Sequence, residues 1–171
     1  MKKLIVAIFL LVGISYAANA QKFAMVDMEY IMKNIPSFET ANEQLNQVSK
    51  KWQTDVDTQM QEVQKMYKNY QTELVFLSED MKTKREEEIV AKEKAVQELK
   101  RSYFGPEGEL FKKRQSLMKP IQDEVYTAIQ DISKEKDLEL VFDKSSSMSV
   151  IFTSPKLDIS DVVLQKLGYS K

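Results

Sequence analysis

The sequence predicts an α+β fold that is mostly α-helical, with a long antiparallel helical hairpin that projects as an arm from a small β-containing body. The chain of 171 residues has only 4 Gly and 4 Pro, so long uninterrupted elements are expected. Apolar residues recur every three or four positions from Ala41 to Leu77, which is the spacing of one helix face. Strand-like segments are short and lie on either side of this helical region.

Residues 1–20 have the pattern of a secretory signal peptide. A basic start at Lys2 and Lys3 precedes an apolar run over Leu4–Val12, and a small-residue cleavage site follows at Ala18–Ala20. The apolar run is shorter than the ~20 residues that a membrane-spanning helix needs. An uncleaved membrane anchor is the alternative. We expect cleavage after Ala20 and export of the mature chain.

Composition excludes several kinds of active site. Because the chain has no His and no Cys, it has no disulfide, no thiolate nucleophile, no zinc site of the usual kind and no Ser-His-Asp triad. It also has no Gly-rich phosphate loop. The carboxylates of Asp55, Asp57 and residues 86–88 lack the spacing of a calcium or acid–base site. We therefore expect no enzyme activity, no cofactor and no metal. Since 25 basic residues are balanced by 26 acidic ones, nucleic acid is not an expected partner.

The first part of the mature chain predicts a strand followed by a long helix. Residues 22–28 are apolar enough for a buried strand, and residues 29–34 fit one or two helical turns. Pro36 is expected to end those turns, and Ser37 to cap the next helix. The stripe of that helix consists of Ala41, Leu45, Val48, Trp52, Val56, Met60, Val63, Tyr67, Tyr70, Leu74 and Leu77. Because the stripe is narrow and about 60 Å long at 1.5 Å per residue, it requires a partner helix.

The partner is expected to be the return helix of a hairpin. Ser78 can cap a first turn that contains Glu79 and Asp80. The stripe of this return helix consists of Met81, Ile89, Val96, Leu99 and Tyr103. Residues 104–108 contain two Gly and one Pro, which must interrupt the helix. A further stripe follows at Leu117, Ile121, Val125, Ala128 and Ile132. Pro120 is expected to kink this last helix or to mark a restart.

The C-terminal part predicts a β-hairpin and a short helix. Residues 138–142 and 149–153 have the composition of two strands, and a Ser-rich turn separates them. Asp158 or Ser160 is expected to cap the final helix, and Gly168 to end it.

These elements predict a body and an arm after cleavage of residues 1–20. Residues 21–36 and 137–171 form a body, and residues 37–136 form an arm with its tip near 76–81 and a break at 104–108. Three short strands bury too little surface to anchor so long an arm. We therefore expect the chain to oligomerise, although the strands do not determine the number of subunits.

Four segments and the long charged hairpin carry a family resemblance. The segments are Phe23–Asp27, the stop at Pro36, Asp137–Asp143 and Leu157–Leu164. Together they resemble the Skp/OmpH family of periplasmic chaperones over essentially the whole mature chain. The resemblance implies a periplasmic homotrimer with a pooled, barrel-like β body. It also implies that the arms enclose a cavity, which holds unfolded outer-membrane β-barrel proteins without ATP.

Two sets of residues follow as site candidates. The arm residues expected to contact unfolded clients are Met60, Met66, Tyr67, Phe76 and Met81, because Met and aromatic side chains suit promiscuous contacts. Ordinary packing within the hairpin is the alternative for this set. The residues expected in the oligomer body are Phe23, Met25, Val26, Leu140, Phe142 and Ile151.

Two further interpretations are open. The basic residues between Lys82 and Arg114 allow a transient contact with a membrane surface, although the neighbouring acids favour a solvated helix. A structural coiled-coil spacer or adaptor of the cell envelope is the alternative to a chaperone, since it would share the arm and the export signal.

Overall fold

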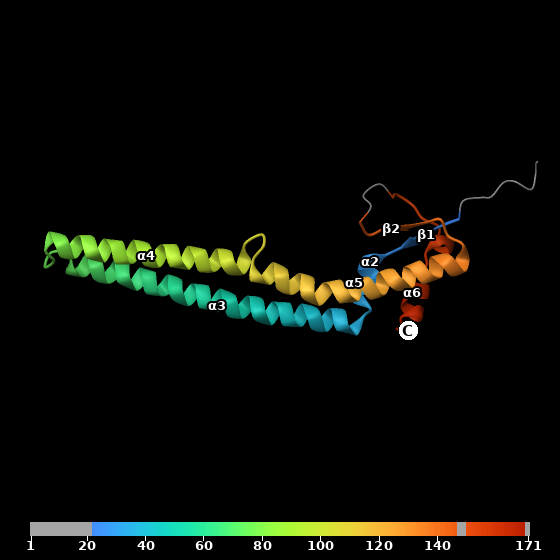
Figure 1. Ribbon diagram of the computed structural model, residues 1–171, viewed down its shortest axis with the longest axis horizontal. Coiled ribbons are helices and arrows are strands. Elements are labelled where there is room, and N and C mark those ends of the chain that lie inside the picture. The colour runs from blue at the N-terminus through green and yellow to red at the C-terminus, as the bar shows by residue number, and fades with distance from the viewer. Residues whose placement is uncertain (1–21, 147–149, 170–171) are drawn as a thin grey trace, which may run out of the picture. The chain divides into compact units, whose positions relative to one another are not determined.

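The computed structural model describes residues 22–146 and 150–169. The elements in chain order are β1 (Phe23–Val26), α2 (Met28–Lys33), α3 (Pro36–Glu73), α4 (Glu79–Phe104), α5 (Glu109–Lys136), β2 (Leu140–Asp143), the 3-10 helix η1 (Pro155–Leu157) and α6 (Ser160–Lys166) (Figure 1). The predicted mostly helical α+β fold class is confirmed. The predicted signal peptide lies outside the described residues.

The chain divides into two compact units. One unit comprises residues 1–35 and 124–171, and the other comprises residues 36–123. We call the described part of the first unit the body and the second unit the arm. Helix α5 contributes its first half to the arm and its second half to the body.

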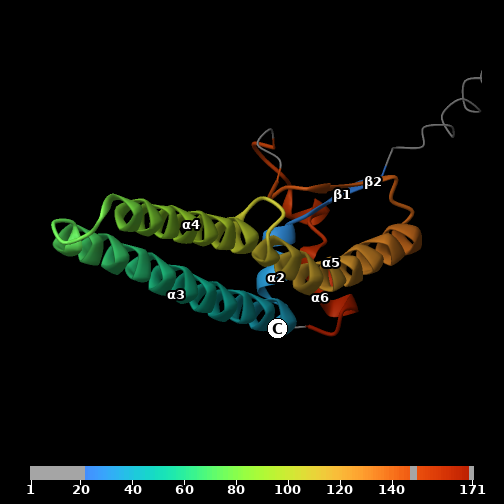
Figure 2. The same cartoon turned by 60° about the vertical axis from the view of Figure 1, so that its left-hand side comes forward.

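The arm is built on an antiparallel hairpin of α3 and α4, which lie side by side in both views (Figures 1 and 2). The chain reverses over residues 74–78. As predicted, Ser78 caps α4, and its hydroxyl accepts a hydrogen bond from the Met81 amide at 3.4 Å. The buried residues of α3 are Ala41, Leu45, Val56 and Val63, whereas Met60 and Tyr67 of the predicted stripe are exposed. The buried stripe is therefore narrower than the sequence pattern indicates.

Two predicted helix boundaries in the arm are wrong. Helix α3 begins at Pro36 rather than after a Ser37 cap, because proline has the φ angle of a first helical residue and lacks an N–H that would be unpaired there. At the other end α3 stops at Glu73, so Leu74 and Leu77 belong to the turn. Helix α5 runs through Pro120 as one helix, so the proposed restart does not occur.

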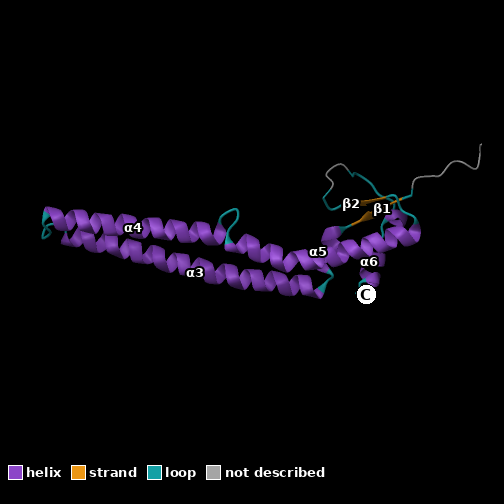
Figure 3. Cartoon of the chain, in the orientation of Figure 1, coloured by secondary structure: helices purple, strands orange, loops and turns teal. Residues whose placement is uncertain are grey.

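The predicted break between α4 and α5 is a tight loop that projects from the helices (Figure 3). The Gly105 amide donates to the Arg101 carbonyl at 2.8 Å, and the Gly108 amide donates to the Gly105 carbonyl at 2.9 Å. A Cβ at Gly105 would collide with the Arg101 carbonyl oxygen, and a Cβ at Gly108 would lie 2.8 Å from the carbonyl oxygens of Ser102 and Tyr103. The loop therefore requires glycine at both positions because of close backbone approach.

The body contains a two-stranded sheet. Strands β1 and β2 are parallel, and their register pairs Phe23 with Leu140 and Val26 with Asp143. The predicted β-hairpin of residues 138–142 and 149–153 is wrong, because β2 pairs with β1 and residues 150–153 form no strand. Ile151 in that segment is 99% exposed. Strand-like composition is not sufficient for a strand when no backbone partner is available.

Helices α2 and α6 and the second half of α5 supply most of the body core. Ile31, Val125, Ile132 and Val163 are almost fully buried. The Asp27 side chain caps α2 by accepting from the Tyr30 amide at 2.9 Å. As predicted, α6 ends at glycine: Gly168 has a φ of 86°. The Tyr169 amide then donates to the Leu164 carbonyl at 2.8 Å, as in a Schellman motif.

Candidate functional site

Exposed apolar side chains are the most prominent surface feature of the arm. They fall into a tip, which we define as residues 74–81, and a groove between α3 and α4. The predicted client-binding residues divide between these two places. Phe76 and Met81 are exposed at the tip, and Met60 and Tyr67 line the groove. Met66 is half-buried on α3 and lines neither.

The tip carries the most exposed apolar pair of the arm. Val75 is 82% exposed and Phe76 is 86% exposed. Charged groups beside them are engaged in ion pairs, between Lys82 and Glu79 at 2.7 Å and between Arg85 and Glu73 at 3.8 Å. The tip therefore presents apolar side chains beside two ion pairs and the exposed Asp80. Sequence reasoning missed Val75, although a run of four apolar residues at 74–77 cannot lie on a single helix face.

The groove lies along the hairpin close to the Gly105–Gly108 loop and has a volume of about 770 Å³. Its lining residues are Met60, Val63, Gln64, Tyr67, Glu93, Val96, Gln97, Lys100, Arg101, Phe104 and Gly105. Val63 and Val96 are buried and belong to the apolar cluster of the hairpin, which Phe104 also packs against. The groove thus has an apolar floor and a polar rim.

An aromatic stack between α3 and α4 contacts Phe104, one of the lining residues of the groove. The rings of Trp52 and Tyr103 lie 4.8 Å apart between centroids and are inclined by 7°. The ring of Phe104 meets that of Tyr103 edge-on at 6.3 Å. Trp52 was expected in the stripe of the long helix, but its pairing with Tyr103 became visible only in the folded hairpin.

The polar rim of the groove contains one acidic residue, Glu93, and two basic residues, Lys100 and Arg101. The negative charge of Glu93 raises the pKa of the Tyr67 hydroxyl, and burial and a hydrogen bond to Glu93 add to this effect. Lys100 and Arg101 take part in none of the ion pairs found within residues 22–146 and 150–169. The groove therefore contains one carboxylate close to the Tyr67 hydroxyl and two cations that form no ion pair within the described residues.

Polar contacts between α3 and α4 fix the alignment of the hairpin. Lys92 contacts Glu62 at 2.7 Å and Gln59 at 2.6 Å. The Tyr70 hydroxyl donates to the Glu86 carboxylate. This hydrogen bond is the main reason that the pKa of Tyr70 is raised to about 12. These contacts fix the position of α4 along α3, and with it the relative positions of the groove residues on the two helices.

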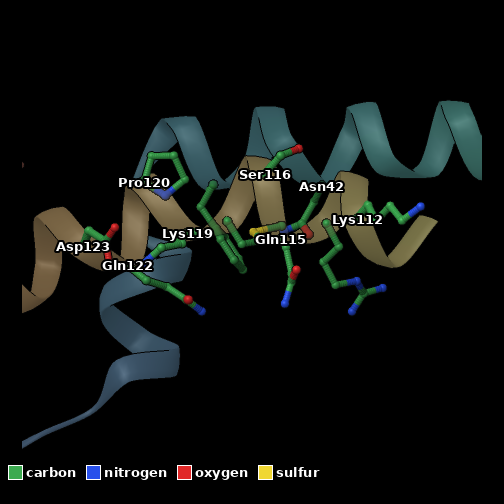
Figure 4. Close-up of a pocket in the computed structure, with 11 residues that line it drawn as sticks. Asn42, Lys112, Gln115, Ser116, Lys119, Pro120, Gln122 and Asp123 are labelled. Atoms are coloured by element: carbon green, nitrogen blue, oxygen red, sulfur yellow. Dashed lines mark hydrogen bonds and ion pairs between the residues drawn. The ribbon is translucent and has the colours of Figure 1, made fainter. Parts of the chain in front are cut away.

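A second groove of about 980 Å³ lies between the start of α3 and the first half of α5. Figure 4 shows Asn42 of α3 beside Lys112, Gln115 and Lys119 of α5. Lys112 pairs with Glu109 at 2.9 Å, and Lys119 pairs with Asp123 at 3.1 Å. Most of the residues that line this groove are polar or charged, and part of their basic charge is compensated by neighbouring acids.

The residues predicted for the oligomer body divide between core and surface. Met25 and Val26 are buried, whereas Phe23, Leu140 and Phe142 are exposed. The rings of Phe23 and Phe142 meet edge-on with centroids 6.5 Å apart. Ile151, the last of the residues predicted for the oligomer body, is also exposed. The sheet therefore has an exposed apolar face in the single chain.

A cluster of polar side chains beside this sheet connects the ends of β1 and β2 to the segment before α6. Lys144 contacts Asp158 at 2.6 Å and Asp27 at 3.7 Å. Burial raises the pKa of Asp158, but hydrogen bonds from Lys144 and Ser160 outweigh burial, so the pKa of this carboxyl lies below its usual value. Burial also raises the pKa of Asp143, but hydrogen bonds from Ser145 and the Met28 amide outweigh it, so the pKa of this carboxyl is lowered as well.

The described part of the chain holds no group of three or more acidic side chains placed to bind a metal ion. None of its helices combines the length and the apolar character that a membrane span requires.

A comparison with protein families gives a match over most of the chain. The OmpH family, described as Outer membrane protein (OmpH-like), matches residues 22–167. An uncharacterized protein of Aquifex aeolicus (strain VF5) is 26% identical over 173 residues, which cover 98% of this chain and 96% of that protein.

A solved structure shares the fold. It is the crystal structure of an OmpH-like protein of Caulobacter crescentus CB15, provisionally described as an outer membrane chaperone. The TM-score is 0.69 at 14% identity, and the match covers 88% of this chain and 86% of that one. Because the family match spans nearly the whole chain beyond the first 21 residues, this protein belongs to the OmpH-like family of outer membrane proteins.

Proposed function

We propose that this protein is an ATP-independent holdase chaperone of the periplasm, which binds unfolded outer-membrane β-barrel proteins between the arms of a trimer and prevents their aggregation. The observation that carries the proposal is the set of exposed apolar side chains along the arm, including Met60, Tyr67, Val75, Phe76 and Met81. The family match and the solved OmpH-like structure described as a chaperone support it.

The mechanism is multivalent weak contact. Met and aromatic side chains adapt to many apolar partners. Several weak contacts from linked arms give a high total affinity while each remains easily broken. A client is released when its folding into the outer membrane removes its exposed apolar surface. No bond is made or broken in this process, so the protein acts without catalysis.

The exposed face of the body supports self-association. Phe23, Leu140 and Phe142 gather on one sheet, and large exposed apolar patches mark interaction surfaces. We propose that three chains bury these residues and Ile151 against one another. Sedimentation of the mature protein should give three times the chain mass. Phe142→Asp should shift the protein towards the monomer, whereas the control Lys156→Asp, at another exposed body position, should not.

Export is part of the proposal. The mature protein recovered from the periplasmic fraction should begin at Gln21. A chain that keeps residues 1–20 and remains in the membrane fraction would contradict it.

Light scattering tests the chaperone function directly. An unfolded outer-membrane β-barrel protein is diluted from urea with and without the mature protein at a range of ratios. We expect suppression of scattering that saturates near three chains per client. Unchanged scattering at an excess of the protein would overturn the proposal.

Tip variants link this effect to the arm. Val75→Ser with Phe76→Ser should require about threefold more protein for half-suppression, because each apolar contact contributes only part of the total affinity. The matched control is Gln71→Ser with Thr72→Ser, which changes two exposed polar residues before the turn.

A structural spacer of the envelope is the second candidate. The ion pairs of Lys92 and Arg85 across α3 and α4 favour it, since they stiffen the hairpin independently of any client. This candidate predicts one folded envelope protein as the dominant partner in a pulldown and no effect on client scattering.

A further inference from the structure

The groove between α3 and α4 has features that a general apolar surface lacks. It joins an apolar floor formed by Val63 and Val96 to two adjacent cations, Lys100 and Arg101, on a single helix turn. Its lining contains one acidic residue, Glu93, against these two cations.

We propose that this groove selects segments of an unfolded chain in which an aromatic or large aliphatic side chain lies next to a carboxylate. The inference rests on the proposed function, because it names which part of an unfolded client the arm holds. The apolar side chain enters between Met60, Tyr67 and Phe104, and the carboxylate meets Lys100 and Arg101.

The shape of the groove favours this occupant. Its floor is formed by the buried Val63 and Val96, so a side chain that enters displaces water from Met60 and Phe104 without reorganising the hairpin. The stack of Trp52 on Tyr103 and the Gly105–Gly108 loop hold Phe104 in place. The site is therefore formed before a ligand arrives, which lowers the cost of binding.

Charge complementarity selects the neighbour of the apolar residue. Lys100 and Arg101 have no acidic partner among the ion pairs of the described residues, so an incoming carboxylate does not have to displace one. A basic neighbour would be repelled, because Lys100 and Arg101 outnumber the one carboxylate, Glu93, among the lining residues. The expected preference is therefore for acidic over basic segments.

Site-specific crosslinking tests the proposal in the full mature protein. Because the chain has no Cys, Gln64→Cys introduces one attachment point for a benzophenone label in the groove. Gln61→Cys is the matched control, an exposed α3 residue that does not line the groove. Three short biotinylated peptides serve as probes. The first carries Phe near Asp, the second Phe near Lys, and the third Ala near Asp.

We expect the Phe–Asp peptide to crosslink at Gln64→Cys about fivefold more than either other peptide, since exposed charge pairs contribute modestly. Lys100→Glu with Arg101→Glu should reverse the order of the Phe–Asp and Phe–Lys peptides. The control Lys113→Glu with Arg114→Glu changes another adjacent Lys-Arg pair in the arm and should keep the original order. Circular dichroism and sedimentation confirm that each variant keeps its fold and assembly.

The outcomes separate this inference from the proposed function. Equal crosslinking of the three peptides, or a preference that the charge reversal leaves unchanged, would overturn the groove proposal even if the protein suppresses client aggregation. A reversed peptide preference in a protein that fails to suppress scattering would support the groove and reject the chaperone function.

Discussion

The body and the arm are stabilised in different ways. In the body, short elements far apart in the sequence are joined by hydrogen bonds, such as that from the Asp27 amide to the Ser160 hydroxyl at 2.8 Å. In the arm, two long helices bury a thin line of residues, and much of the remaining apolar surface stays exposed. The body therefore buries apolar residues from several elements in one core, whereas the arm buries only a narrow line of them and leaves others exposed along its helices and tip.

The largest expected effect comes from matched truncations in the two regions. Ile31→Ala in the body and Ile89→Ala in the arm remove the same atoms from buried sites. We expect a loss of about 4 kcal/mol in the free energy of unfolding for Ile31→Ala and about 2 kcal/mol for Ile89→Ala. The difference arises because neighbours and water can close around a cavity in a two-helix stripe more easily than in a core.

Urea denaturation at fixed protein concentration measures both values, since self-association makes stability depend on concentration. Hydrogen exchange should show that the Ile89→Ala loss is confined to α3 and α4. Equal losses for the two variants would contradict the contrast between body and arm.

The second prediction concerns the loop that ends the hairpin. Gly108→Ala places a Cβ 2.8 Å from two carbonyl oxygens, and overpacking of this kind costs about 1–3 kcal/mol. Exchange of the amides near residues 101–112 should become faster. Pro106→Ala, at an exposed position of the same loop, is the control and should have a smaller effect. Unchanged stability of Gly108→Ala would show that the backbone can relax at this site.

The third prediction concerns the polar cluster of the body. Asp158→Asn weakens the contact with Lys144, and we expect a loss of about 1 kcal/mol at neutral pH. Because the folded-state pKa of Asp158 is lowered, its contribution is fully present above the ordinary aspartate pKa of about 4. It is lost as the pH falls through the lower folded pKa. Unfolding curves of wild type and variant should therefore converge in acid, and a constant difference at all pH values would contradict this assignment.

The smallest expected effect lies in the arm. The Tyr70 phenol should titrate at about 12, and Glu86→Gln should lower that pKa towards its ordinary value of about 10. Because the folded-state pKa is raised, the stabilisation is present below the ordinary pKa and is lost as the pH rises through about 12. NMR of the tyrosine ring measures both values. A Tyr70 pKa that is the same in both proteins would show that Glu86 is not its main partner.

Local chemistry explains which features were predictable. The Ser78 cap, the break at 104–108 and the Gly168 terminus involve contacts between residues a few positions apart, so the residue types alone indicate them. The long helix α3 was expected, but its start was not: it begins at Pro36 instead of after a Ser37 cap, because a proline that ends one turn can also start the next helix.

The candidate site was only partly predictable for a related reason. Met60 and Tyr67 fit the helical stripe, so the sequence could not show that they would remain exposed beside the groove. Lys100 and Arg101 were assigned to a solvated basic face, because their position relative to Glu93 and Tyr67 depends on how α3 pairs with α4. Val75 was missed because the exact end of α3 decides which apolar residues leave the helix.

By itself, the sequence determined the mostly helical fold, the two arm helices, their interruption and the absence of His and Cys chemistry, since these depend on composition and short-range periodicity. Only the tertiary structure decided the parallel pairing of β1 with β2, the unpaired state of residues 150–153 and the stacking of Trp52 on Tyr103. The reason is physical: strand pairing and side-chain contacts join residues distant in the chain, and the free energy of a distant contact depends on the whole fold.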